Sequence, residues 1–248
     1  MGMDGIMTSW AHVDAPSHRW QEAQRAELVF WVRHREWILS GAFRTKIQAR
    51  AKRIEDWIRR YFPIDSTTRI LEIGGGAAGL VDQFELGIRY GYDPLASFYR
   101  REFGSVINPA VLLTGGRAEA MPYPNMCFDI VIICNVLDHC ESPDRVLSEL
   151  RRVLRASGLM YLAVNTYGAV MRLVKSLGPE VEHPYIYTHA GVARACRRAG
   201  FRVIDSRLDD PDEMWRFYPL SRRRLRTAVQ WVLLQLGCLH YSEFLLRS

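Results

Sequence analysis

Ile70-Leu-Glu-Ile-Gly-Gly-Gly-Ala-Ala-Gly79 is the stretch that decides the fold of this 248-residue chain. A short apolar run beginning at Arg69 ends in a glycine cluster, in which Gly74, Gly76 and Gly79 satisfy the pattern G-x-G-x-x-G. A tight turn of this kind lets a ligand approach the backbone while the N–H groups of a following helix point at it. The stretch therefore predicts a strand over 69–73, a helix over Gly79–Phe84 and a ligand site between them.

The segments that follow alternate between short apolar runs and amphipathic helices. We expect strands at 88–92, 111–113, 128–134, 159–164, 201–204 and 214–218, and helices at 143–154, 169–177 and 189–199. Thr188 can cap the last of these helices and Gly200 can end it, while Ser157–Gly158 is expected to separate the helix at 143–154 from the next strand. Phe128–Cys134 is apolar throughout, which is typical of a strand buried on both faces of a parallel sheet. The alternation indicates a doubly wound α/β fold.

A helical extension precedes this α/β region. Residues 1–65 carry an apolar stripe from Ile47 to Ile58 at spacings of three and four, and we expect two helices with a break near Ser40–Gly41. The domain that follows is expected to span 66–220. Because the faces of a doubly wound sheet are covered by its own helices, the stripe must be buried elsewhere. We therefore expect Trp20–Trp37 to pack over the mouth of the ligand site as a lid.

Residues 221–248 are expected to form an amphipathic helical segment. Four arginines between positions 222 and 226 precede the apolar run Ala228–Leu239, which is shorter than the roughly 20 residues that a membrane span requires. A helix that is apolar on most sides must be covered. Three surfaces could bury this helix: the edge of the chain's own sheet, the same helix of a second copy, or the surface of an anionic membrane.

The composition is that of an ordinary globular protein, with 48% hydrophobic and 24% charged residues. The net charge of +6 lies in the two flanking segments, and the region 66–220 is nearly neutral, which speaks against a nucleic-acid-binding body. Five cysteines form no C-x-x-C pair, so we expect reduced thiols in a cytoplasmic protein and no zinc or other metal site.

Two carboxylates indicate what the glycine stretch binds. Asp93 ends the second expected strand, nineteen residues after Gly74, where a carboxylate can accept hydrogen bonds from both hydroxyls of a ribose. Dinucleotides and S-adenosylmethionine both satisfy this arrangement. Glu72 discriminates between them, because a carboxylate two residues before the first glycine repels an anionic pyrophosphate and favours a cationic sulfonium.

Four motifs in order resemble the class I S-adenosylmethionine-dependent methyltransferases, in particular the small-molecule branch called ubiE-like or type 11. They lie within residues 68–204 and comprise Glu72-Ile-Gly-Gly-Gly76, Gly91-Tyr-Asp93-Pro94, Gly116-Arg-Ala-Glu-Ala-Met-Pro122, and the block that runs from Phe128 through Asn135-Val-Leu-Asp-His139 and Leu150-Arg-Arg-Val-Leu-Arg155 to Gly158. The resemblance implies a Rossmann-like, seven-stranded, mainly parallel sheet.

The resemblance also implies a role for each matching position. The residues that would hold the cofactor S-adenosylmethionine are Glu72, Gly74, Gly75 and Gly76 for its methionine part, Asp93 and the adjoining Pro94 for the ribose, Ala118 and Glu119 for the adenine, and Asn135 for a backbone contact beside the sulfonium. Two positions depart from the family pattern. Ala78 replaces a glycine, and Arg117 stands where the family often has an aspartate that contacts the adenine, so this contact must come from elsewhere.

Methyl transfer requires an oriented nucleophile and, for many acceptors, a base. His139 beside Asp138 lies just past the fourth strand, where the crevice opens, and is our candidate base; transfer by proximity alone is the alternative. His183, Tyr185 and Tyr187 belong to a histidine-proline-aromatic run that resembles the substrate loop of relatives, although the tyrosines could also merely anchor that loop.

These observations predict a methyltransferase that acts on an oxygen or nitrogen of a small-molecule, glycan or lipid-linked acceptor. A non-catalytic binding or scaffold protein on the same fold is one alternative, and a nicotinamide-dependent oxidoreductase is another. The sequence after the fourth strand, Asn135-Val-Leu-Asp138, lacks the N/D-P-P-Y/F tetrad of nucleic-acid amino-methyltransferases. We therefore do not expect a nucleic-acid substrate.

Overall fold

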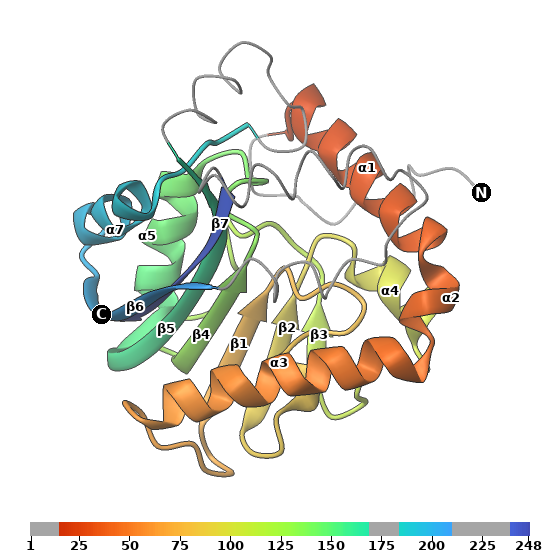
Figure 1. Cartoon of the computed structure of the whole chain (residues 1–248), viewed down its shortest axis with the longest axis horizontal. Helices are drawn as coiled ribbons and strands as arrows, with labels where there is room; N and C mark the ends of the chain where they lie inside the picture. The colour runs from red at the N-terminus through yellow and green to blue at the C-terminus, as the bar shows by residue number, and fades with distance from the viewer. Residues whose placement is uncertain (1–14, 169–183, 210–238) are drawn as a thin grey trace.

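The computed structural model describes residues 15–168, 184–209 and 239–248. In these residues one sheet has the strand order β3-β2-β1-β4-β5-β7-β6. Its strands are β1 (Arg69–Ile73), β2 (Ile88–Tyr92), β3 (Leu112–Thr114), β4 (Phe128–Cys134), β5 (Leu154–Tyr167), β6 (Arg202–Asp209) and β7 (Leu239–Arg247). The pairs from β3 to β5 are parallel, whereas β7 is antiparallel to both of its neighbours. The expected seven-stranded, mainly parallel sheet is therefore confirmed (Figure 1).

Helices cover both faces of the sheet (Figure 1). They are α1 (His18–Arg33), α2 (Arg35–Ile38), α3 (Gly41–Arg59), α4 (Ala96–Phe103), α5 (Pro143–Val153) and α7 (His189–Arg198). Four of these six helices have a polar N-cap, since the side chains of Ser17, Ser40, Ser142 and Thr188 each accept a hydrogen bond from the first turn. The expected break at Ser40–Gly41 and the expected Thr188 cap are both confirmed, and Gly200 follows α7 with a φ of +88°.

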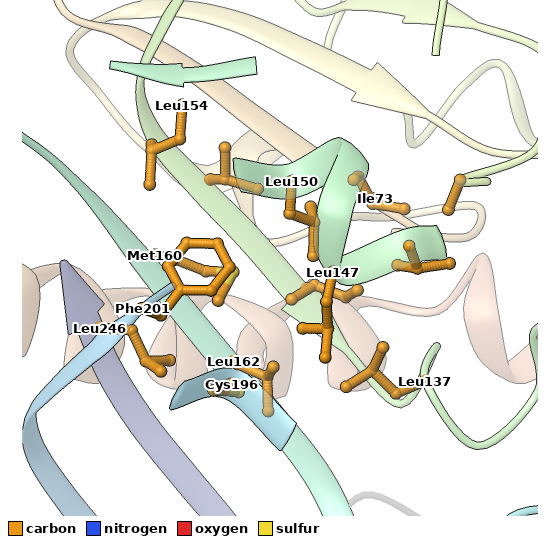
Figure 2. Close-up of a cluster of buried hydrophobic side chains, with 14 of the residues drawn as sticks. Ile73, Leu137, Leu147, Leu150, Leu154, Met160, Leu162, Cys196, Phe201 and Leu246 are labelled. Atoms are coloured by element: carbon orange, nitrogen blue, oxygen red, sulfur yellow. The ribbon is translucent and has the colours of Figure 1, made fainter. Parts of the chain in front are cut away.

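One face of the sheet packs against α5 and α7. Leu147 and Leu150 of α5 are fully buried with Met160 and Leu162 of β5, and Cys196 of α7 joins the same cluster (Figure 2). The apolar positions of α5 recur at helical spacing and therefore meet the sheet together. This half of the molecule follows the sequence expectation closely.

The opposite face of the sheet differs from what the sequence predicts. The helix expected over Gly79–Phe84 is a single 3-10 turn, η2 (Val81–Gln83), because only eight residues separate Gly79 from the start of β2. The N-terminal helix α3 covers this face instead, and its Ile54 and Ile58 are completely buried in a cluster with residues of β1, β4 and β5. The assumption that the sheet's own helices already cover its faces is therefore wrong for the stripe of α3.

The helix expected over 221–247 is also wrong for Leu239–Arg247. These residues form β7, which fills the slot between β5 and β6. Both faces of β7 are buried, with Tyr241 and Leu245 toward α3 and Phe244 toward α7, so the segment shows no polar alternation that would mark it as a strand. The expected helix at 169–177, the strand at 214–218 and residues 221–238 lie outside the described residues, as do the alternatives of a second copy or a membrane surface as cover.

The boundaries of three strands also differ from those expected from the sequence. β5 begins at Leu154, directly after α5, so Ser157–Gly158 lie inside the strand and do not separate it from the helix. β6 extends to Asp209, well past the expected end at Ile204, and β3 starts one residue later than expected. In each case hydrogen bonds to a neighbouring strand extend or shift the element, and these bonds cannot be read from local sequence.

Candidate active site

The glycine loop after β1 needs glycine for two reasons. Gly74 and Gly76 have φ values of +69° and +67°, in the left-handed region that disfavours side chains. A Cβ on Gly74 would also lie 2.3 Å from Val136 Cγ2, and one on Gly76 would lie 2.3 Å from the Trp31 ring. The loop thus has a conformation that glycine adopts readily and other residues do not, and it lies between the residues that follow β4 and helix α1.

Glu72 lies on β1 beneath this loop and is 3% exposed. Its Oε2 accepts a hydrogen bond from Val81 N at 2.9 Å, and its carboxylate packs against Gly75 and Gly79. Burial raises the pKa of Glu72 from 4.5 to about 7. A nearby cation would favour the charged form and lower this pKa, so the position suits a cationic ligand group.

Asp93 follows β2 and is also buried, at 5% exposure. Its Oδ2 accepts a hydrogen bond from Gly76 N at 3.2 Å and its Oδ1 accepts one from Leu95 N at 2.8 Å, across the intervening Pro94. Burial raises the pKa of Asp93 to about 6. The structure therefore joins Glu72, the three glycines and Asp93 in one loop system, as the sequence predicts.

The loop after β3 is organised differently from the expectation for the adenine contact. Ala118 and Glu119 are buried, but Glu119 Oε1 accepts hydrogen bonds from Glu141 N and Ser142 N at 2.8 and 3.4 Å. Glu119 thus supports the start of α5. Arg117, which replaces the family's aspartate, is 4% exposed and forms an ion pair with the Glu141 carboxylate.

The residues after β4 carry two unusual features. Asn135 has a φ of +52°, which is uncommon for a residue other than glycine. Its backbone N–H donates to Ala163 O, while its side-chain Oδ1 is buried and has no hydrogen-bond partner among the residues that the structure describes. A buried acceptor of this kind costs free energy unless a donor arrives. Strain and an unpaired acceptor at one residue point to a ligand contact.

The candidate base lies four residues further on. The His139 side chain is 28% exposed, and its Nε2 lies 3.9 Å from Oδ2 of Asp138, which is almost fully buried. The histidine thus reaches the surface beside a carboxylate that can orient it. Asp138 does not cap the helix that follows, because Ser142 is the N-cap of α5.

The two tyrosines of the expected substrate loop approach the same region. The Tyr187 hydroxyl donates to Leu137 O at 3.3 Å, and the Tyr185 hydroxyl donates to Glu141 O. The two rings stack with centroids 6.4 Å apart. The tyrosines therefore line the residues around His139 and also anchor their own segment. His183 lies outside the described residues.

Helix α1 contributes contacts that the motifs did not predict. Trp31 lies against Gly76 of the glycine loop, Trp20 stacks on the Arg117 guanidinium at 5.1 Å, and Arg19 donates to Cys140 O at 3.1 Å. These contacts bring α1 to the loops after β1, β3 and β4, beyond the carboxyl ends of the strands (Figure 1). The sequence predicted that Trp20–Trp37 lies over the mouth of the site, and the departure at Arg117 was the signal that could have revealed its contact with Trp20.

The described residues contain neither a cluster of metal-ligating side chains nor a helix that could span a membrane. Within residues 15–168, 184–209 and 239–248, no three His, Cys, Asp or Glu side chains come together as a metal site would require. None of the helices in the same ranges is long and apolar enough to cross a membrane.

Comparison with known proteins agrees with this geometry. Residues 71–162 match the family model described as a methyltransferase domain. No curated protein sequence matches the chain. A putative sarcosine dimethylglycine methyltransferase from Galdieria sulphuraria is similar in structure, with a TM-score of 0.63, 12% identity, and coverage of 80% of this chain and 85% of the other.

Two further solved structures share the fold. Geranyl diphosphate C-methyltransferase from Streptomyces coelicolor A3(2) has a TM-score of 0.63 and 13% identity, with 80% of this chain and 79% of the other covered. The [4+2]-cyclase SpnF has a TM-score of 0.58 and 19% identity, with 79% of this chain and 80% of the other covered. Residues 71–162 thus match a methyltransferase domain, and the strand order and the solved structures show that the chain has the Rossmann-like fold of class I methyltransferases.

Proposed function

We propose that the protein transfers a methyl group to an oxygen or nitrogen of a small-molecule, glycan or lipid-linked acceptor. The observation that carries the proposal is the convergence of two buried carboxylates and one unpaired buried acceptor on the glycine loop. Glu72, Asp93 and Asn135 come from three neighbouring strands, and the ends of these strands meet at one edge of the sheet.

These groups match the polar parts of S-adenosylmethionine. Asp93 offers carboxylate oxygens for ribose hydroxyls, and Glu72 offers a negative charge near the sulfonium and ammonium groups. The unpaired Asn135 Oδ1 needs a hydrogen-bond donor, which the cofactor's ammonium group can supply. Among the residues that the structure describes, the two buried carboxylates Glu72 and Asp93 would repel a pyrophosphate, which speaks against a nicotinamide cofactor.

When bound, the cofactor supplies an electrophilic methyl group on sulfur. An acceptor oxygen or nitrogen that took this methyl group would have to give up a proton. We assign that proton to His139, oriented by Asp138, and we assign contacts with the acceptor to Tyr185, Tyr187 and His183. The stacked tyrosines support this assignment, because they flank the loop that carries His139.

The fold by itself does not determine the reaction. SpnF shares this architecture and is a cyclase, while the Streptomyces enzyme methylates carbon. A scaffold protein that binds the cofactor without catalysis is the alternative that most needs a test.

We also propose a cytoplasmic location, which rests on the odd number of cysteines in the sequence.

Calorimetry with S-adenosylmethionine, S-adenosylhomocysteine and NAD tests cofactor choice. We expect the first two to bind and NAD not to bind. Asp93→Ala should weaken S-adenosylmethionine about 30-fold, the loss of about 2 kcal/mol in charged hydrogen bonds, while Asp56→Ala on the exposed surface of α3 should bind as the wild type does. If neither S-adenosylmethionine nor S-adenosylhomocysteine gave a heat of binding, the proposed function would be contradicted.

Turnover separates the enzyme from the scaffold. Production of S-adenosylhomocysteine is measured against a panel of hydroxyl and amine acceptors. With an active acceptor, His139→Ala should lower turnover about 100-fold at unchanged cofactor affinity, and His18→Ala on the exposed side of α1 serves as the control. A loss of less than about threefold would favour transfer by proximity, and binding without turnover on any acceptor would favour the scaffold.

A further inference from the structure

Helix α1 has two different kinds of anchor at its two ends. Near its C-terminal end, Trp31 packs edge-on against Tyr99 and Phe103 of α4, within an apolar cluster. At its N-terminal end the contacts are polar: Ser17 N donates to Glu141 Oε1 at 2.6 Å, and the Glu141 carboxylate also binds Arg117. The helix is therefore held by apolar packing at one end and by charged groups at the other.

Arg117 connects α1 to the loop that follows β3. Its guanidinium pairs with Glu141, approaches Glu119 Oε2 to 3.8 Å and lies under the ring of Trp20. Both Arg117 and Trp20 are almost fully buried. One side chain thus links the start of α1, the loop after β3 and the loop before α5. We call Arg117, Glu141, Ser17 and Trp20 the clasp.

The groups assigned to the cofactor lie beneath this arrangement. Glu72 and Asp93 are no more than 5% exposed, and the Trp31 ring lies against Gly76 between them. Because the Trp31 ring occupies the space beside Gly76, a ligand that contacts the backbone at Gly76 has to displace this part of α1. Helix α1 ends at His34, where α2 begins, so the clasp lies at the end of α1 that is remote from this break.

We propose that Arg117 is a positioning residue that controls the entry and release of the cofactor by fastening α1 over the crevice, an inference that rests on the proposed function. The position that resembles an adenine-contacting site in the family here holds the lid. Loosening the clasp should raise the association rate as well as the dissociation rate, because a closed lid blocks passage in both directions. A residue that merely contacted the ligand would change the dissociation rate with little effect on association.

The test uses the full-length chain with Arg117→Ala and Glu141→Gln. Glu141→Gln keeps the shape of the side chain and its contact with Ser17 but removes the charge that Arg117 pairs with. Arg101→Ala is the matched control, because Arg101 is an exposed arginine paired with its neighbour Glu102 on α4. Melting temperatures and circular dichroism confirm that each variant is folded.

Hydrogen exchange of residues 18–33 is measured first, without ligand. Both clasp variants should exchange at least several-fold faster there than the wild type and Arg101→Ala, while β4 stays unchanged. Exchange equal to that of the control would overturn the clasp. This measurement requires no cofactor, so it tests the clasp even if the proposed function is wrong.

Stopped-flow kinetics with S-adenosylhomocysteine then tests the control of passage. We expect both rate constants to rise about tenfold in Arg117→Ala, which corresponds to the loss of one charge-assisted hydrogen bond, and the dissociation constant to change less than threefold. A rise in the dissociation rate alone would overturn the role as a gate and make Arg117 a direct contact. Absence of binding in the wild type would contradict the proposed function and leave the hydrogen-exchange result to decide the clasp.

Discussion

Helices α1 and α3 both belong to the N-terminal extension, yet they are attached to the rest of the molecule in different ways. α3 buries Phe43, Ala51, Ile54, Trp57 and Ile58, and its Arg53 forms two hydrogen bonds, of 2.8 and 3.0 Å, with Glu243 of β7. α1 buries only Trp20 and Ala23 along its length. α3 is thus part of the sheet's core, whereas α1 lies on loops.

The difference shows that one extension supplies a layer of the sheet's core through α3 and contacts with the loops of the candidate site through α1. α3 takes the place that the missing helix after the glycine loop would occupy, and the fold depends on it. Removing α1 would expose the crevice but leave the sheet covered. Substitutions in α3 should therefore affect global stability, and substitutions in α1 should affect local opening.

A first contrast is expected between the two anchoring carboxylates. Glu243 is completely buried, and Arg53, Arg207 and Tyr161 all bind it. Glu243→Gln removes the buried negative charge that the partly exposed Arg53 and Arg207 both bind, and should cost about 3 kcal/mol of unfolding free energy through the weakened charged hydrogen bonds. Glu141→Gln in the clasp should cost at most about 2 kcal/mol. Urea denaturation measures both, and equal losses would contradict the distinction between the helices.

A second contrast is expected from apolar truncation on the two helices. Ile54→Ala on α3 leaves a cavity at a fully buried site and should cost about 2 to 5 kcal/mol. Val29→Ala on α1, where the side chain is 50% exposed, should stay within about 0.5 kcal/mol. If Val29→Ala proves as costly as Ile54→Ala, α1 also belongs to the core and does not move as a lid.

The smallest expected effect is the pH dependence of stability caused by Glu72, which lies between the α3 face and the glycine loop. Its pKa in the folded protein, about 7, exceeds the ordinary 4.5, so the folded state holds a proton that the unfolded chain has already released. Stability should therefore fall as the pH rises from 5 to 7 and then level off. Relative to Glu72→Gln, the wild type should lose about 2 kcal/mol between pH 5 and pH 8. Parallel stability curves would show that Glu72 titrates normally.

Much of the site could be predicted from the sequence because its signals are local. Gly74 and Gly76 are required by their own backbone angles, and Glu72 and Asp93 lie at fixed distances from them along the chain. The helices α5 and α7 and the strands β1, β2 and β4 likewise carry their periodicity and their caps within a dozen residues. For these parts local propensity and tertiary packing favour the same structure.

The rest was decided by contacts between residues far apart in the chain. Arg53 and Glu243 are separated by 190 residues, and Arg117 and Trp20 meet through no shared motif. A strand buried on both faces, such as β7, shows no alternation, so its sequence resembles a buried helix until the slot between β5 and β6 is known. By itself the sequence determined which residues surround the glycine loop. Only the tertiary structure decided which helix covers the sheet and which covers the crevice, because that choice depends on the space that the shortened turn η2 leaves open.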